Sequence, residues 1–119
     1  MYDFVTHAMN LHPQPFAMIA AGKKTVELRL LDEKRKLIAP GDTLVFTNTD
    51  TGEQLRCTVK KLHIFPNFAV LYSALPLEKC GYLPEEVADA RPEDMELYYS
   101  PEKQAQYGVV GIELEKQES

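Results

Sequence analysis

The spacing of hydrophobic and polar residues changes several times along the chain, and each spacing predicts one type of element. Residues 3–11 ("DFVTHAMNL") have the pattern of an extended segment. The next run, "PFAMIAA", repeats its apolar residues at helical spacing and follows prolines, which favour the first turn of a helix. Gly22 comes next, where helices commonly end with a residue at positive φ. We therefore predict a helix from about Pro15 to Ala21.

Strand-like alternation begins directly after that helix, in "KTVELRLL". Successive side chains of a strand point to opposite faces. One predicted face is apolar and the other polar: Val26, Leu28 and Leu30 against Thr25, Glu27 and Arg29. Glu27 and Arg29 are therefore expected to project side by side from one strand.

The middle of the chain predicts a β-hairpin from Thr43 to about Ile64. A Pro-Gly-Asp turn precedes its first arm, and "TDTGEQ" has the composition of a turn into the second arm. The apolar residues of the second arm change parity near Lys60 and Lys61, which predicts a β-bulge there. Bulges are common where a sheet curls into a barrel.

Helical spacing returns from Phe68 to Tyr107, but prolines interrupt it and predict short segments. Ser100, followed by Pro101, resembles the start of one of these helices. The run "GVVGIELE" then alternates as a strand again. Strands first, short helices next and a closing strand predict an α+β fold, a small and partly open β-barrel with short helices packed around it.

Size and composition agree with a single domain over residues 1–119. A domain of 119 residues buries well over half of its unfolded surface, and 45% hydrophobic and 26% charged residues are near the average for soluble domains. No apolar run reaches the roughly 18 residues of a membrane span, and the first ten residues lack the features of a signal peptide. We therefore expect a cytoplasmic protein without a membrane partner.

Metal and disulfide chemistry have no support in the sequence. The two cysteines, Cys57 and Cys80, are closely spaced neither with each other nor with a histidine, so they form no zinc or disulfide framework. The carboxylates Glu93, Asp94 and Glu96 fit a solvated helix face and lack the spacing of metal ligands. We expect two reduced, largely buried thiols, no metal and no cofactor.

The charge of the chain is uneven. A net charge of −5 argues against a general nucleic-acid binder, because Lys and Arg supply most of the non-specific affinity for phosphates. Residues 1–65 nevertheless contain nine Lys/Arg and seven Asp/Glu, whereas residues 66–119 contain four and eleven. The cations of the first part gather in three groups: Lys23, Lys24 and Arg29; Lys34 to Lys36; and Arg56, Lys60 and Lys61. They indicate either a local basic face on an acidic body or, more commonly, solvated side chains.

The first of these groups lies in "AAGKKTVELRL", and "GKKT" is similar to the end of a phosphate-binding P-loop. That motif requires Gly-Lys followed directly by Ser or Thr, an earlier Gly where Ala17 stands, and strand-then-helix order. Here a helix precedes a strand, so we reject a P-loop.

The spacing of Gly22, Lys24, Glu27 and Arg29, set between an apolar helix and an apolar strand, resembles the G-x-K-x-x-E-x-R signature of the ASCH family, within the PUA-like superfamily of small RNA-associated β-barrels. The downstream "GDTLVF" and the ending "YYSPEKQAQYGVVGIEL" are also similar to segments of bacterial ASCH proteins. The resemblance spans nearly the whole chain. It implies a PUA-like barrel with a ligand cleft walled by this motif.

Each residue of the motif suits a polar cleft. Gly22 permits a sharp turn and a close approach by a phosphate. Lys24 can meet a phosphate or act as a base, and Arg29 has a planar fork for a phosphate or a base edge. Glu27, flanked by cations, should stay ionised and can accept hydrogen bonds from an exocyclic amine or relay a proton. The alternative is a surface ion pair of Glu27 with Arg29, and the resemblance favours the cleft.

Further residues extend the predicted binding site for RNA or a nucleotide. Lys23 adds a cation beside the motif, Tyr99 a ring for base stacking, and Ser100 the N-terminus of a helix, which favours an anion. The tyrosines at 98, 99 and 107 can equally cover an edge of the core, and Ser100 is most simply a helix cap. His12 and His63 have no identifiable partner and are interpreted as structural.

Two classes of function follow from the resemblance. In the first, the protein binds RNA or a nucleotide without catalysis. In the second, it is a small metal-independent hydrolase of RNA or of an acylated cytidine nucleoside, with Lys24 and Glu27 as catalytic residues. The amidohydrolases in question have a Thr nucleophile three residues after the Lys, where this chain has Glu27, and Thr25 lies in a different register. A third class, a protein-interaction module using the acidic half, leaves the charge cluster unexplained.

Overall fold

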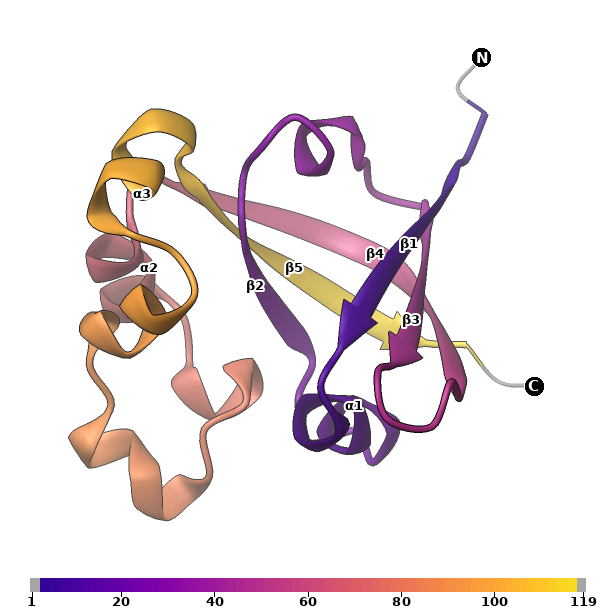
Figure 1. Cartoon of the computed structure of the whole chain (residues 1–119), viewed down its shortest axis with the longest axis horizontal. Helices are drawn as coiled ribbons and strands as arrows, with labels where there is room; N and C mark the ends of the chain where they lie inside the picture. Colours follow the sequence, from indigo (N-terminus) through magenta and orange to yellow (C-terminus); the bar gives the residue numbers. More distant parts are fainter. Residues whose placement is uncertain (1–2, 118–119) are drawn as a thin grey trace.

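Five strands form one curled sheet, a partly open barrel, in the computed structural model, which describes residues 3–117 (Figure 1). The strands are β1 (Thr6–Leu11), β2 (Val26–Leu30), β3 (Thr43–Asn48), β4 (Gln54–Phe65) and β5 (Val109–Lys116). Their order is β1-β3-β4-β5-β2, so β1 and β2 form the two edges. The β1–β3 pair is parallel, and the other three pairs are antiparallel.

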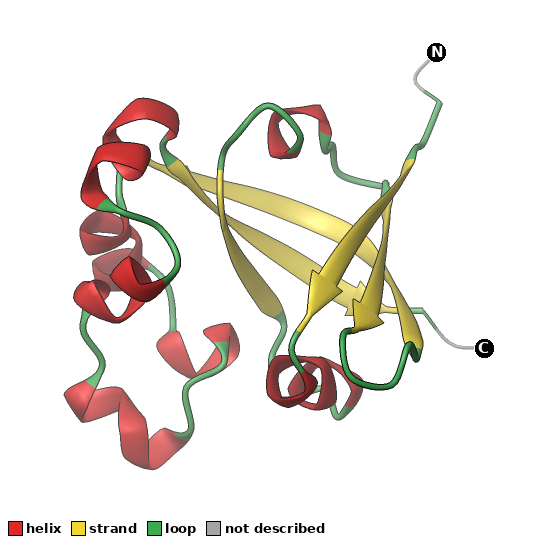
Figure 2. Ribbon diagram, viewed as in Figure 1, coloured by secondary structure: helices red, strands yellow, loops and turns green. Residues whose placement is uncertain are grey.

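One helix connects the two edge strands, and the later helices gather on one side of the barrel (Figure 2). The connecting helix is α1 (Pro13–Ala20), and the short η1 (Arg35–Leu37) lies between β2 and β3. The other helices are α2 (Phe68–Ala74), η2 (Leu77–Cys80), η3 (Pro84–Asp89), η4 (Pro92–Leu97) and α3 (Pro101–Tyr107). We refer to residues 68–107 as the helical layer. Within residues 3–117, no helix is both long and apolar enough to span a membrane.

The predicted elements are confirmed, with small shifts of their ends. α1 begins at Pro13, two residues before the predicted start, because proline suits the first helical position and His12 before it is extended. Gly22 follows the helix at φ +77°, as expected. The register between β4 and β5 shifts between Val59 and Lys61, which is the predicted bulge.

Two hydrophobic cores hold these layers together. The first fills the barrel and includes Cys57, whereas the second lies between β2 and the helical layer and includes Cys80. Both thiols are free and buried, as predicted. The apolar residues of β2 (Val26, Leu28 and Leu30) belong to the second core and therefore pack against the helices.

The polar residues of β2 share the other face of the sheet, which points into the barrel. The β2–β5 register pairs Glu27 with Ile112 and Arg29 with Val110. Ile112 and Val110 belong to the barrel core, and directly opposite residues of an antiparallel pair lie on the same face. Strand β2 is therefore covered on both faces, and its charged residues project inward at the open edge of the barrel.

A buried carboxylate fastens the start of β1 to the turn before β3. Asp42 is fully buried and accepts hydrogen bonds from the backbone N–H groups of Val5 and Ala39, both at 3.0 Å. The Nε2 atom of His7 lies 2.8 Å from its second oxygen. This cluster stabilises the parallel β1–β3 pair and thus the position of one edge of the barrel.

Candidate functional site

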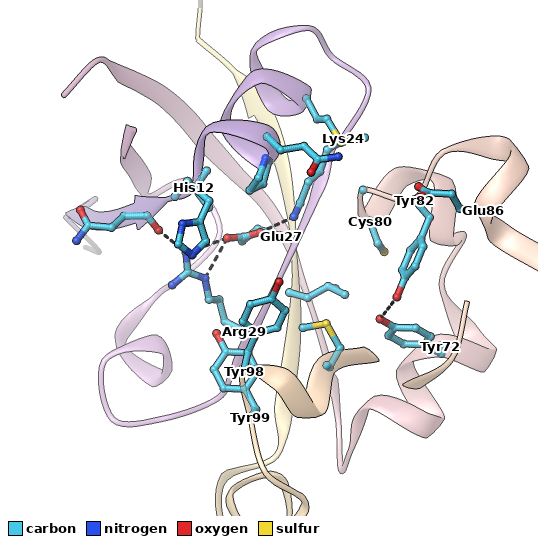
Figure 3. Close-up of a pocket in the computed structure, with 18 residues that line it drawn as sticks. His12, Lys24, Glu27, Arg29, Tyr72, Cys80, Tyr82, Glu86, Tyr98 and Tyr99 are labelled. Carbon is cyan, nitrogen blue, oxygen red and sulfur yellow. Dashed lines mark hydrogen bonds and ion pairs between the residues drawn. The ribbon is translucent and has the colours of Figure 1, made fainter. Parts of the chain in front are cut away.

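A cavity of about 510 Å³ lies where the edge of the barrel faces the helical layer (Figure 3). Its walls come from the end of β1 with α1, from β2, and from residues 72, 80–82, 86, 95 and 98–99 of the helical layer. This volume lies in the range of small-molecule and cofactor sites, about 300–1,000 Å³. The cavity therefore has room for a ligand of nucleotide size.

Glu27 lies in the wall of this cavity and is shared by two cations. Its side chain is only 4% exposed; Lys24 Nζ lies 2.8 Å from Oε1, and Arg29 Nη2 and Nε lie 2.9 and 3.0 Å from Oε2. Burial by itself would raise the pKa of Glu27, but the charges and hydrogen bonds of Lys24 and Arg29 outweigh burial and hold this pKa below its usual range. The carboxylate is thus ionised at neutral pH and is not part of an exposed ion pair.

Arg29 also bridges the opening between the two edge strands. Its Nη2 atom donates a hydrogen bond to the backbone carbonyl of Asn10 on β1, at 2.9 Å. The same guanidinium therefore contacts Glu27 on β2 and the backbone of β1. This places the charged group of Lys24, Glu27 and Arg29 at the seam of the barrel, where the sheet does not close.

Lys24 is held between α1 and the helical layer. Its backbone N–H donates to Met18 O at 3.1 Å, which fixes the turn after α1. Its side chain runs past Gly81, a residue at φ +111°. A Cβ atom at position 81 would lie 3.2 Å from Lys24 Cδ and 3.5 Å from Nζ. The glycine therefore leaves the space that the lysine side chain occupies.

Aromatic rings line a second part of the cavity. Tyr99 is half-buried and stacks on Phe68 with 5.9 Å between ring centroids, and its carbonyl accepts a hydrogen bond from Gln104 Nε2 at 3.1 Å. Burial raises the pKa of Tyr99. Tyr98 is 65% exposed. Tyr99 thus covers a core edge and the cavity together, whereas Tyr98 offers a ring face to solvent.

A pair of hydroxyl groups lies across the cavity from Glu27 and Arg29 (Figure 3). The oxygens of Tyr72 and Tyr82 are 2.7 Å apart, and Tyr82 donates to Asp94 Oδ2 at 2.8 Å. The thiol of Cys80 lies nearby, and burial raises its pKa to about 11, so it stays protonated at neutral pH.

The cavity brings together some of the residues predicted from the sequence and omits others. Lys24, Glu27, Arg29 and Tyr99 line it, as does Tyr98. The remaining predicted site residues lie outside its wall: Gly22 in the turn after α1, the exposed Lys23, and Ser100, whose Oγ accepts a hydrogen bond from Lys103 N and caps α3. Their roles in ligand binding stay predictions.

Some cavity residues had no signal in the sequence. Tyr72 lies in α2 and Tyr82 in the loop between η2 and η3, both far along the sequence from the motif, so no local spacing connects them with it. His12 lines the cavity at the start of α1, where it had been interpreted as structural. His63 does have a partner, Glu113, at 3.1 Å across β4 and β5.

Among residues 3–117, neither a threonine nor a cluster of metal ligands lies beside the charged group in the cavity wall. Thr25 lines a second hollow of about 430 Å³, together with His63, and not the cavity with Lys24 and Glu27. Among the described residues, no group of three or more His, Cys, Asp or Glu side chains is arranged to hold a metal ion.

The curled five-stranded sheet with short helices on one side defines a PUA-like α+β protein. A family model described as the ASCH domain matches residues 9–118, and the chain therefore belongs to the ASCH family. The family assignment predicted from the sequence is thus confirmed. No curated protein matches the chain.

Solved structures of similar proteins agree with this assignment. The crystal structure of hypothetical protein PH0355 is 32% identical, with a TM-score of 0.78 over 94% of this chain and 99% of that one. The solution structure of protein PF0455 from Pyrococcus furiosus is 33% identical, with a TM-score of 0.69 over 96% and 99%. The crystal structure of ASCH from Zymomonas mobilis, at 16% identity and a TM-score of 0.61, covers 91% of this chain and 65% of that one. It is similar in fold alone.

Proposed function

We propose that the protein binds RNA or a nucleotide in the cavity beside Lys24, Glu27 and Arg29. The observation that carries this proposal is the buried carboxylate held by two cations in the wall of an open cavity. Replacing a buried ion pair or triad by apolar residues is often neutral or stabilising, so such a group is poorly explained by stability alone. Two cations and one anion also leave one positive charge in excess, which suits an anionic ligand.

The free hydrogen-bonding capacity of this group fits the parts of a nucleotide. Lys has three N–H donors and Arg five, more than their bonds to Glu27 and Asn10 use, so donors remain for a phosphate. The carboxylate has further lone pairs for an amino group of a base. The exposed ring of Tyr98 at the same cavity is suited to base stacking.

Charge around the cavity favours one direction for an RNA strand. Residues 84–96 of the helical layer contain six acidic residues and one arginine, which repel phosphates. The exposed cations are Lys23, in the turn after α1, and Lys34 and Lys36, in the segment between β2 and β3, and we assign to them contacts with the RNA backbone. The same proposal includes Gly22 and Ser100. Gly22 lets the RNA backbone come close to the turn after α1, and Ser100 contacts an anion at the start of α3.

Binding of a short fluorescent single-stranded RNA, followed by anisotropy at several salt concentrations, tests this proposal. Lys24→Ala should weaken binding and, by losing one phosphate contact, reduce the slope of log K against log salt by about 0.7. Arg29→Lys keeps the charge and should weaken binding by losing the planar fork. Lys61→Ala is the matched control, since Lys61 is exposed on β4 and does not line the cavity. Unchanged affinity and slope in folded Lys24→Ala and Arg29→Lys proteins would refute the proposal.

A metal-independent hydrolase is the second candidate. Lys24 Nζ lies 2.8 Å from Glu27 Oε1 in the cavity wall. The ionised carboxylate of Glu27 can accept a proton from water or from a 2′-hydroxyl. The lowered pKa of Glu27 makes it a weaker base, however, which ranks hydrolysis below binding. Incubation with labelled RNA and with acylated cytidine in EDTA decides between them: product that is lost in Glu27→Gln establishes an enzyme, and binding without product supports the first candidate.

A further inference from the structure

The paired hydroxyl groups of Tyr72 and Tyr82, across the cavity from Glu27, limit which chemical group of a ligand can bind beside them. Tyr72 and Tyr82 belong to the helical layer and lie outside the motif of β2. We propose that Tyr72 presents a hydrogen-bond acceptor of fixed direction to the cavity, and that it selects a ligand with an exocyclic amino group, such as an amino-bearing nucleobase. This inference rests on the proposed function and specifies its ligand.

The direction of the hydrogen bonds follows from counting hydrogens. A tyrosine hydroxyl has one hydrogen to donate. Asp94 Oδ2 is the acceptor of its contacts: it accepts from the hydroxyl of Tyr82 and from the backbone N–H of Arg91 at 3.1 Å. The hydrogen of Tyr82 is therefore used by Asp94, at 2.8 Å. The short contact of 2.7 Å between the two hydroxyls then requires Tyr72 to donate to Tyr82.

Packing keeps this arrangement in place. Tyr72 is 9% exposed, and its ring makes edge contacts with Tyr82 and Phe68, at 5.8 and 6.4 Å between centroids. Burial and the hydrogen bonds with Tyr72 and Asp94 raise the pKa of Tyr82 far above its usual value, so its hydrogen is retained. With its own hydrogen used, Tyr72 has only lone pairs left for a ligand.

The cavity thus has two walls of opposite character. Lys24 and Arg29 can only donate hydrogen bonds, which suits a phosphate or a carbonyl. Tyr72, whose hydrogen is used by Tyr82, can only accept a hydrogen bond from a ligand. An amino group near Tyr72 completes a hydrogen bond, but a carbonyl oxygen in the same place faces another lone pair. The two walls together favour a ligand that is anionic at one end and bears an amine at the other.

Two pairs of mononucleotides test this selectivity: AMP with IMP, and CMP with UMP. Within each pair the exocyclic amino group is exchanged for a carbonyl, and the ring nitrogen beside it gains a hydrogen. Titration calorimetry at pH 7 measures the affinity ratio within each pair. The wild-type protein should prefer the amino member. Tyr82→Phe releases the hydrogen of Tyr72, and the ratio should fall about threefold to tenfold, the effect of one neutral hydrogen bond.

Two further variants separate this role from a general effect on folding. Asp94→Ala, at an exposed position outside the cavity wall, frees the hydrogen of Tyr82 and should lower the same ratio. Tyr107→Phe removes a hydroxyl outside the cavity and should keep the wild-type ratio. Nucleotide binding with an unchanged ratio in both Tyr82→Phe and Asp94→Ala overturns the inference and leaves the proposed function standing. Absence of binding of all four nucleotides and of RNA to the wild-type protein overturns the proposed function, and this inference with it.

Discussion

Replacement of Gly81 by alanine tests how the charged group is positioned, and Gly52→Ala is its matched control. Both glycines have positive φ, +111° and +75°, so alanine strains the backbone at both positions. A Cβ atom at Gly52 would meet no atom within 4 Å, whereas at Gly81 it would lie 3.2 Å from Lys24 Cδ. Only Gly81→Ala therefore disturbs Lys24, which is held on its other side by Glu27 at 2.8 Å.

The expected losses follow from these contacts. A left-handed residue other than glycine costs about 1–2 kcal/mol, and unfolding entropy of about 2.1 cal/mol/K per residue converts each kcal/mol into about 4 °C of Tm for a chain of this size. Gly52→Ala should thus lower Tm by about 4–8 °C. Gly81→Ala should lower Tm further, because Lys24, held 2.8 Å from Glu27, must shift by a few tenths of an ångström, and it should weaken RNA binding by up to about tenfold through the disturbed charge-assisted bond.

Thermal unfolding at several pH values provides an assay that needs no ligand. Gly81→Ala should lower Tm by more than Gly52→Ala at pH 7, where Glu27 is ionised. This difference in Tm should shrink as pH falls below about 4.5, the ordinary pKa of a glutamate, because protonation of Glu27 removes its attraction for Lys24. Equal losses in the two variants at pH 7, with RNA affinity unchanged in both, would show that Lys24 does not depend on Gly81.

Four other predictions concern stability and are measured by urea unfolding. Glu27→Gln should lose about 3–5 kcal/mol at neutral pH, because two partly buried cations lose their counter-charge; since the pKa of folded Glu27 is lowered, the deficit should shrink as pH falls below 4.5, and a deficit independent of pH would contradict this. Asp42→Ala should lose about 3 kcal/mol or more by leaving two partly buried N–H donors unpaired, and a loss below 1 kcal/mol would argue against a role of Asp42 in holding β1. Gln104→Leu should lose about 2–4 kcal/mol, since its amide accepts from one backbone group and donates to another; Gln104→Glu should keep part of this stability. Ser100→Ala should lose about 1 kcal/mol as a lost helix cap, and an accompanying loss of RNA affinity would support its predicted contact with an anion.

Local patterns were sufficient to predict the elements and the motif. Alternation in β2 correctly separated Glu27 from Leu28, and the parity change correctly located the bulge between Val59 and Lys61. These predictions succeed because the two faces of a strand and the termini of a helix are determined by residues close in sequence. The cytoplasmic location and the identity of the ligand stay predictions.

Contacts between distant segments could not be predicted in this way. The parallel pairing of β1 with β3 depends on the fold as a whole, and alternation did not indicate that β2 is covered on both faces. The burial of Glu27 and the approach of Tyr72 and Tyr82 to the cavity both result from tertiary packing. Much of the cavity wall therefore comes from the helical layer, where the interrupted helical spacing of the sequence does not connect these residues with the motif.

The seam of the barrel also has a consequence for self-association. Edge strands present unpaired backbone groups that can recruit the sheet of another molecule and start aggregation. Here the two edges of one sheet are joined across the seam by Arg29, which donates to the β1 backbone at Asn10, and by α1, which connects their ends. Arg29, which we propose contacts a ligand, thus also covers part of an edge strand that could pair with another molecule. Its loss is therefore expected to lower the solubility of the protein as well as its affinity for the ligand.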